Sequence, residues 1–316
     1  MSSVARKPPT VAVIDIGSNS IKVLVATRAT DGGIATLATR TVEARISAGI
    51  SRNPPVLAEE GMVRGLAAIS ELLAVAAPFR PEQTVLVATS AVRDAVNGAE
   101  FRVRVLAATG HDIRILSGDE EANLIGRGLT SDPALAGLQD FYVFDLGGGS
   151  LECLAFRQRH IEQAASLQLG CVRLTERFAA DPTAPFSDEA RRQTAAHVRV
   201  VLGAGSFRFT LPGAPAVGTG GTITTVRVIL AADCGLALEA TPSVVTVAQL
   251  RALLDRIAPL PLAERRRVPG MPAPRADVLP VALATVVTLA EANGLKEFHH
   301  SFRNLRYGLA DALLAD

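Results

Sequence analysis

Apolar runs and helically spaced apolar positions alternate along the chain, and they predict its secondary structure. Runs rich in β-branched residues over 11–16, 21–27 and 34–42 predict strands, the first two forming a hairpin around a Gly-Ser-Asn turn. Over 57–77 the apolar residues recur three and four apart, which predicts a helix that ends before Pro78.

The same pattern continues through the rest of the first half. Buried strands are predicted over 84–88 and 113–116, with a helix over 99–109 between them that ends at Gly110. The stretch SGDEEANLIGRGL then predicts a further helix, with Ser117 as its N-cap and acids in its first turn, where they favour the helix dipole.

The second half shows strands followed by helices in a similar order. Strands are predicted over 140–145, 151–156 and 159–169, helices over 171–178 and 188–202, a short strand over 216–218 that leads into a helix, three helices between 247 and 294, and a last helix over 301–314. We expect the Pro- and Arg-rich piece over 259–274 to be a surface connection.

Each half opens with a similar turn. IDIGSNSIKVL near the start and FDLGGGSLECL in the middle share four identities, which pair Asp15 with Asp145, Gly17 with Gly147, Ser20 with Ser150 and Leu24 with Leu154. A Gly- and Ser-rich hairpin turn can point several backbone N–H groups into one concavity, and such a nest binds phosphate oxygens.

An aspartate beside such an anion repels phosphate, so its natural role is to hold Mg²⁺ directly or through water. Either turn taken singly is more often a tight hairpin without a ligand. The repetition argues against that alternative, as does the GTGGT turn over 218–222, which leads into a helix. We therefore expect two pseudo-symmetric halves that hold a phosphorylated substrate and its metal from both sides of a cleft.

Composition excludes several other classes. Hydrophobic residues make up 48% of the 316 residues and the net charge is +1, which is typical of a globular protein and gives no sign of a nucleic-acid partner. Clustered arginines are expected on solvated helix surface, namely Arg191, Arg192, Arg265, Arg266 and Arg267.

Cysteine and histidine spacing suggests neither a disulfide framework nor a metal site. Cys153, Cys171 and Cys234 are far apart and odd in number, and the adjacent His299 and His300 point in different directions on any regular element. The N-terminus has no apolar signal core and no charge-free apolar window reaches membrane length. We expect a soluble cytoplasmic protein with no membrane partner.

Consecutive motifs give the chain a specific resemblance. VAVIDIGSNSIKVLVA, ATSAVRDAVNG, ILSGDEEANLIGRG, FDLGGGSLE, QLGCVRLTERF, GTGGTITTV and SFRNLRYGL resemble, in order, signatures of the exopolyphosphatase and guanosine pentaphosphate phosphohydrolase family. That family belongs to the acetate kinase, sugar kinase, chaperone and actin superfamily. The resemblance implies an α/β fold of two ribonuclease H-like domains, with the active site in the cleft between them.

The resemblance also implies roles for individual residues. Glu121, Arg93 and Glu152 match catalytic residues, Glu121 as the base that activates water and Arg93 as a phosphate-binding arginine. Asp15, Asp145 and Glu152 match acids near Mg²⁺ or another divalent ion. The phosphate-binding set comprises Gly17, Ser18, Asn19, Ser20, Lys22, Gly147, Gly148, Gly149, Ser150, Gly220 and Gly221, with Lys22 standing where many members have arginine or another polar residue.

The residues by themselves leave plainer alternatives open. Glu120 and Glu121 are also what a helix start requires, and Arg93 can pair with Asp94 at the surface. Strand alternation supports one assignment independently. Glu152 lies two residues after Ser150, so both face the same side of their strand.

The resulting prediction is a metal-dependent exopolyphosphatase of the short, two-domain type, acting on inorganic polyphosphate with a preference for short chains. The alternative substrate is guanosine pentaphosphate, and less favoured hypotheses are an ATP-dependent kinase and a non-catalytic nucleotide-binding regulator. We expect one domain over residues 1–124 plus 301–316 and a second over 125–300, which close over the substrate. A homodimer is a further expectation from the family.

Overall fold

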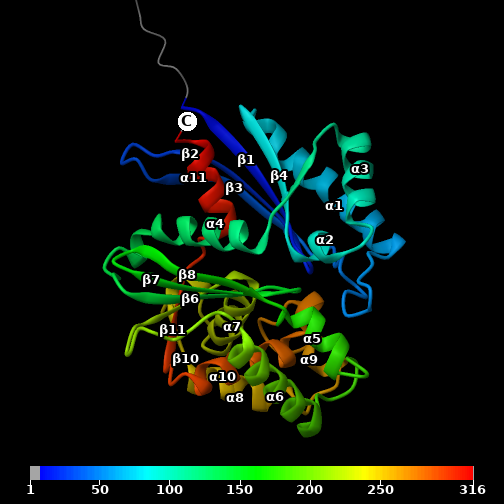
Figure 1. The fold of residues 1–316 in the computed structure, drawn as a ribbon, viewed down its shortest axis with the longest axis vertical. Coiled ribbons are helices and arrows are strands. Elements are labelled where there is room, and N and C mark those ends of the chain that lie inside the picture. The colour runs from blue at the N-terminus through cyan, green and yellow to red at the C-terminus, as the bar shows by residue number, and fades with distance from the viewer. Residues whose placement is uncertain (1–7, 316) are drawn as a thin grey trace, which may run out of the picture.

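The computed structural model describes residues 8–315 and contains two β-sheets with helices packed around and between them (Figure 1). The first sheet has the order β3-β2-β1-β4-β5. Its strands are β1 (Thr10–Ile16), β2 (Ile21–Arg28), β3 (Ile34–Val42), β4 (Gln83–Ala88) and β5 (Ile113–Ile115). β1 to β3 are antiparallel neighbours, whereas β4 and β5 run parallel to β1.

The second sheet repeats this topology with one added strand. Its order is β10-β11-β9-β6-β7-β8, formed by β6 (Phe141–Leu146), β7 (Leu151–Arg157), β8 (His160–Leu167), β9 (Ala216–Thr219), β10 (Val244–Thr246) and β11 (Glu297–His300). Read from β8 to β11, it matches the first sheet strand for strand, with the same antiparallel and parallel pairings. The repeated turns therefore mark a repeated fold.

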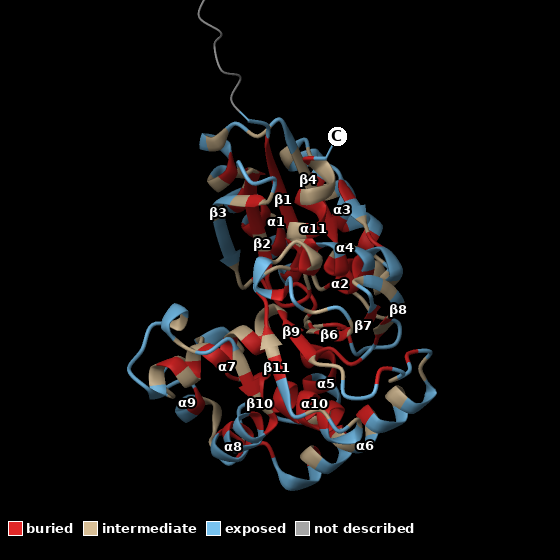
Figure 2. Ribbon diagram, turned by 90° about the vertical axis from the view of Figure 1, so that its left-hand side faces the viewer, coloured by how far each residue is buried: buried red, intermediate tan, exposed pale blue. Residues whose placement is uncertain are grey.

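Helices cover the outer face of each sheet. The first sheet carries α1 (Glu59–Ala76), α2 (Ser90–Asp94) and α3 (Gly98–Thr109). The second carries α5 (Cys171–Phe178), α6 (Asp188–Ala204), α7 (Gly220–Asp233), α8 (Val247–Ile257), α9 (Leu262–Arg265) and α10 (Leu279–Ala292). Figure 2 shows the buried residues concentrated on the sheets and on the inner sides of these helices.

Two helices, α4 (Gly118–Thr130) and α11 (Leu305–Leu313), form a layer between the two sheets (Figure 1). One continuous hydrophobic cluster joins them to Val11 and Val13 of β1 on one side and to Phe141 and Val143 of β6 on the other. The proposed domain boundary after residue 124 lies within α4, so this helix belongs physically to the junction of the two halves.

The crossing of α4 and α11 is unusually close because each helix presents a glycine to the other. A Cβ on Gly308 would lie 1.9 Å from the Leu124 carbonyl oxygen, and one on Gly128 would lie 2.1 Å from the Asn304 carbonyl oxygen. We expect Gly308→Ala to lower the free energy of unfolding in urea by about 1–3 kcal/mol through overpacking. Gly203→Ala in α6, where the Cβ would meet no atom within 4 Å, is the matched control and should not destabilise the protein.

Most predicted elements are confirmed to within one or two residues, and the differences are informative. The last helix begins at Leu305 and not at 301, because residues 301–304 instead form a turn in which Ser301 and Arg303 accept bonds from Thr219. The short elements α2, β10 and β11 were not predicted.

The prediction of solvated surface for the arginine clusters is wrong for Arg265. Its side chain is 1% exposed and donates to the carbonyl oxygens of Pro182, Ala184 and Ala276, which pins the 259–274 connection to the second half. One helical stretch, Glu59–Phe79, is long and apolar enough to cross a membrane by length and composition; here its buried face, including Ile69 and Leu72, packs on the first sheet.

Candidate active site

The four ionisable strand residues of the site all face the central helix layer. Asp15 shares a strand face with Val11 and Val13, and Lys22 lies directly opposite Asp15 in the β1–β2 register. Asp145 and Glu152 are likewise opposite each other in the β6–β7 register. The alternation of each strand therefore aims these side chains at the layer that carries α4.

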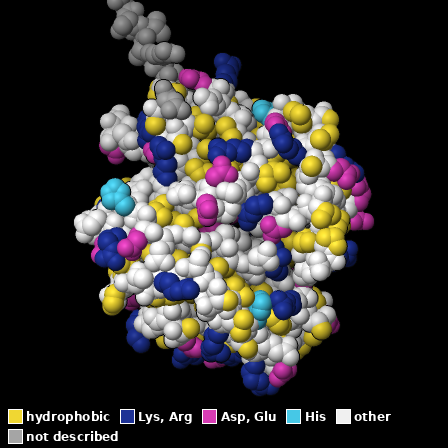
Figure 3. All heavy atoms as spheres, viewed as in Figure 1, with side chains coloured by type: hydrophobic (Ala, Val, Ile, Leu, Met, Phe, Trp, Pro, Cys, Tyr) yellow, Lys and Arg dark blue, Asp and Glu magenta, His cyan; other side chains and the backbone are white. Residues whose placement is uncertain are grey.

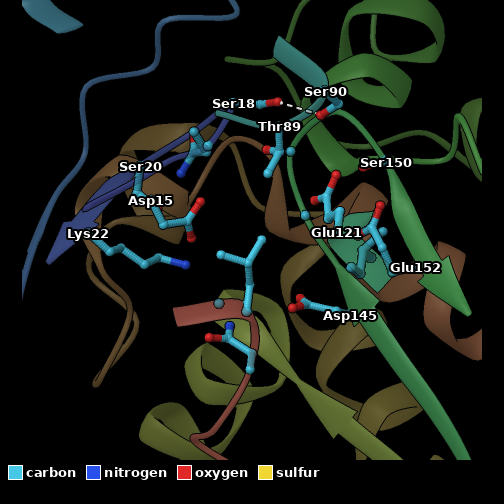
Figure 4. A pocket seen from close by; sticks show the side chains of 18 of the residues that line it. Asp15, Ser18, Ser20, Lys22, Thr89, Ser90, Glu121, Asp145, Ser150 and Glu152 are labelled. Atoms are coloured by element: carbon cyan, nitrogen blue, oxygen red, sulfur yellow. Dashed lines mark hydrogen bonds between the residues drawn. The ribbon is translucent and has the colours of Figure 1, made fainter. Parts of the chain in front are cut away.

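The two repeated turns lie against each other where the halves meet. A Cβ on Gly148 would come within 2.8 Å of the Ser18 Cβ atom and 3.1 Å of the Asn19 nitrogen, and one on Gly149 within 2.3 Å of the Ser90 hydroxyl. Only glycine allows this approach. In Figure 4 the Ser18 and Ser90 hydroxyls, which are 3.1 Å apart, mark the top of the resulting cavity.

Both turns have the same internal bond and the same free donors. Gly17 donates to the Ser20 carbonyl and Gly147 to the Ser150 carbonyl. Within the described part of the chain, no group accepts a hydrogen bond from the next two backbone N–H groups of either turn, Ser18 and Asn19 or Gly148 and Gly149. Two turns with free N–H groups at one place have the geometry that can bind an anion.

Helix α5 holds the second turn in this form. The N–H of Cys171 donates to the Gly147 carbonyl, and those of Val172 and Arg173 donate to the Gly148 carbonyl, which occupies the carbonyl side of the turn. Gly170 makes this contact possible, because a Cβ there would lie 2.2 Å from the Gly149 carbonyl carbon. The fixed turn then presents its remaining N–H groups to a ligand without reorganising.

A cavity of about 70 Å³ lies between the turns, and we call it the site cavity. The predicted residues that line it are Asp15, Gly17, Ser18, Asn19, Ser20, Lys22, Glu121, Asp145, Gly147, Gly148, Ser150, Glu152 and Gly221. Figure 4 shows Asp15 and Lys22 on one wall, with Glu121, Ser150 and Glu152 opposite. Ser150 and Glu152 face the same side, as the strand alternation predicted.

Three predicted residues lie just outside this lining. Arg93 contacts Glu121 from behind, and Gly149 is packed against Ser90. Gly220 has a φ of +78° and sits against Asp145, whose Oδ1 atom would be 2.0 Å from a Cβ at that position. Gly220 therefore positions an acid rather than lining the cavity.

The cavity also contains residues that the sequence did not indicate, chiefly Thr89, Ser90, Cys171, Arg275 and Asn304. Thr89 and Ser90 lie within the quoted ATSAVRDAVNG motif, Cys171 within QLGCVRLTERF and Asn304 within SFRNLRYGL, so these motifs were the available signal. Burial raises the pKa of Asp145, and Lys22 and Asn304 lower it in part. Arg275 follows the supposed surface connection, so nothing local indicated that it reaches the cavity.

The basic side of the cavity balances the two aspartates. Burial raises the pKa of Asp15, and Lys22 and Arg306 lower it in part. Burial and the neighbouring Arg306 in turn hold the pKa of Lys22 below its usual value. The charges of Asp15, Lys22 and Arg306 thus compensate one another only in part, which is common where a charged ligand binds among such groups.

Glu120 and Glu121 are adjacent on α4, but their side chains lie in different environments. Glu120 closes a capping box with Ser117 and is exposed, whereas Glu121 is 6% exposed and faces the cavity. Burial and the nearby Glu152 raise the pKa of Glu121 well above its usual value. Arg93, whose Nη1 atom donates to Glu121 Oε2 at 2.8 Å, lowers it in part and fixes the carboxylate.

Burial, with Asp145 as the second cause, raises the pKa of Glu152 to about 7. Folding therefore favours the protonated carboxyl. The free energy of unfolding falls as pH rises from about 4.5, and the full loss is reached above about 7. We expect Glu152→Gln to raise Tm above pH 7, with the gain disappearing toward pH 4.5. Glu60→Gln, at an exposed acid, is the control, and an equal gain at every pH would contradict the prediction.

The acids do not form a closed metal site. Among residues 8–315, no three His, Cys, Asp or Glu side chains converge closely enough to enclose an ion. Asp15 and Asp145 nevertheless approach the same cavity from the two repeated strands. This donor set fits a hard cation that takes its other ligands from water and substrate oxygens, which is typical of Mg²⁺.

The fold and the cavity are suited to binding a phosphorylated ligand, and the similarity to known proteins identifies the chain as a phosphatase that cleaves phosphoanhydride bonds. The sequence profile of the Ppx/GppA phosphatase family matches residues 24–315. The chain therefore belongs to the Ppx/GppA phosphatase family. The resemblance found in the sequence motifs is confirmed.

Solved structures agree over nearly the whole chain. An exopolyphosphatase from Cytophaga hutchinsonii superposes with a TM-score of 0.84 at 23% identity, covering 97% of this chain and 98% of that one. An exopolyphosphatase-like protein gives 0.85 at 26% identity and 98% of each chain. The Aquifex aeolicus PPX-GPPA enzyme gives 0.76 at 25% identity, covering 98% and 100%. The predicted fold class is confirmed.

Proposed function

We propose that this phosphatase is an exopolyphosphatase that removes the terminal phosphate of inorganic polyphosphate. The observation that carries the proposal is the placement of Glu121, a buried carboxyl of raised pKa between two turns with free N–H donors. A base of this kind is suited to taking a proton from water near neutral pH. The catalytic and binding roles below are part of the same proposal.

In this proposal the terminal phosphate lies between the two turns, with its oxygens toward their N–H groups and the Ser20 and Ser150 hydroxyls. A water oxygen attacks the terminal phosphorus while Glu121 takes its proton. The bond to the bridging oxygen breaks, and the shortened chain leaves with that oxygen. Lys22 and Arg275 offset the charge that develops on the phosphate oxygens.

A divalent ion, Mg²⁺ or a similar hard cation, fits beside Asp15 and Asp145, with Glu152 nearby. When bound, it supplies charge neutralisation of the phosphate oxygens. Arg93 holds Glu121 in place from outside the cavity, so its proposed part is to position the base rather than to bind phosphate directly.

The remainder of the substrate requires more room than the site cavity offers. A second cavity of about 280 Å³ adjoins it and shares Lys22, Gly221, Arg275 and Asn304 with it. Further phosphates of a short chain fit this basic passage. Figure 3 shows Lys, Arg, Asp and Glu side chains interspersed over one face of the molecule.

The adjoining cavity also supports the alternative substrate, guanosine pentaphosphate. Beside the shared cations it has apolar walls formed by Val228, Pro272 and Phe302, and the Phe302 side chain is half exposed. Aromatic side chains of this kind stack on nucleobases. A nucleotide would therefore use a surface that polyphosphate does not need.

Phosphate release with Mg²⁺, measured in parallel on short polyphosphate, long polyphosphate and guanosine pentaphosphate, tests the proposal. We expect the highest kcat/KM on short polyphosphate. We also expect Phe302→Ser to leave that kcat/KM unchanged. Preference for the pentaphosphate, with KM raised by Phe302→Ser, would favour the alternative. Release from none of the three would refute both.

The cytoplasmic location and the homodimer stay predictions.

A further inference from the structure

Arg173 is a buried charge at the junction of the two halves. It is the third residue of α5 and is 9% exposed, yet it does not line the site cavity. Its guanidinium donates from Nε to the Gly149 carbonyl at 2.9 Å and from Nη2 to Asp94 Oδ2 at 2.6 Å, with a longer bond from Nη1 to the Ile50 carbonyl. One side chain thus joins the second turn to two segments of the first half.

Asp94 extends this connection toward the proposed base. It is the last residue of α2 and follows Arg93, which donates to Glu121. Asp94 Oδ1 lies 3.5 Å from Arg93 Nε, while its other oxygen accepts from Arg173. The charges alternate in sign along Arg173, Asp94, Arg93 and Glu121, and the row runs from the second phosphate-binding turn to the base.

We propose that Arg173 and Asp94 form a positioning pair that sets Arg93, and through it Glu121, in register with the second turn. The proposal rests on the function proposed above. Neither residue touches the space where the substrate would lie, so neither is a catalytic residue. Because Arg173 holds the turn by the Gly149 carbonyl and α2 by Asp94, it fixes the distance between the phosphate oxygens and the attacking water.

Loss of Arg173 should disturb this geometry in two ways. The second turn loses a bond at Gly149, and Asp94 loses its strongest partner. Asp94 is then free to pair fully with Arg93, which draws Arg93 away from Glu121. Displacements of about 1 Å in a reacting group can reduce rates by roughly 10²-fold, so the effect should appear in kcat.

The test compares Arg173→Met, Asp94→Asn, the double variant and Arg173→Lys by kcat and KM for phosphate release. We expect either single variant to lower kcat by roughly 10- to 100-fold with KM changed less than about threefold. The double variant should be no worse than the poorer single variant, because the residues act as one unit. Arg173→Lys should recover part of kcat, since lysine can pair with Asp94 but cannot also bind Gly149.

Arg177→Met is the matched control, because Arg177 lies one turn further along α5 and is exposed. It should leave kcat unchanged. Multiplicative losses in the double variant, or a loss of activity in every variant that follows only the folded fraction in a thermal melt, would overturn the positioning role.

Wild-type protein and Glu121→Gln in the same assay separate the two proposals. If the wild type releases phosphate and Glu121→Gln does not, the proposed function stands and the Arg173 and Asp94 variants alone decide the positioning role. An active Glu121→Gln variant would overturn the proposed base and with it the reason for the pair. Wild-type kcat in both Arg173→Met and Asp94→Asn would overturn the pair alone.

Discussion

Glu121→Gln is expected to lower kcat for phosphate release by about 10²–10⁴-fold, the contribution usual for a general base. The amide retains the shape of the carboxyl and can still accept the hydrogen bond from Arg93, but it cannot take a proton from water. The two turns that we propose bind phosphate are untouched, so KM should change little. Steady-state kinetics on short polyphosphate at saturating Mg²⁺ measures both quantities.

The neighbouring acid provides a control within the same helical turn. Glu120 is exposed, pairs with Arg114 and closes the capping box with Ser117. Glu120→Gln should therefore keep full activity and lose at most about 1 kcal/mol of stability. Equal activity losses in the two variants would indicate a general effect of the helix start and would remove Glu121 from its proposed role.

The thermal stability of Glu121→Gln provides a second, independent test of the role of Glu121. Its pKa is raised mainly by burial, so the folded protein loses stability as pH rises above about 4.5, because the carboxyl ionises more readily in the unfolded chain. Glu121→Gln removes that loss. Its Tm at pH 8 should thus equal or exceed that of the wild type, which separates loss of catalysis from loss of folding.

Local pattern was sufficient for most of the longer helices and strands and for much of the cavity. The paired turns could be predicted because the same Asp-Gly-Ser order recurs, and Glu152 because strand alternation places it with Ser150. Glu120 and Glu121 were equivalent as helix-start acids until the structure placed one in the capping box and the other against Arg93. The family resemblance, not the local pattern, singled out Glu121.

What remained hidden depends on contacts between distant segments. Arg275 reaches the cavity because its loop folds back over the start of α7, where its Nη2 atom would lie 2.1 Å from a Cβ on Gly221. Arg265 appeared to be a surface residue because its partners are backbone carbonyls, which leave no signature in a sequence. Strands β10 and β11 have three and four residues, too few for alternation to be recognised.

The second large effect is expected at Lys22. Lys22→Met should lower kcat by about 10²–10³-fold, the loss typical when one preorganised charged donor is removed from a transition-state site. Lys22 lines both cavities and interacts with Asp15 and Asp145, so its removal leaves these two acids facing a phosphate with one cation fewer. The loss should persist at saturating Mg²⁺.

Two further variants serve as controls for Lys22→Met. Lys22→Arg keeps the positive charge and should retain activity to within about tenfold, whereas Lys296→Met removes an exposed lysine and should have no effect. If Lys22→Met lost activity but Lys22→Arg lost as much, the shape of the lysine rather than its charge would be required. If Lys22→Met kept wild-type kcat, the cationic wall would have to be supplied by Arg275 alone.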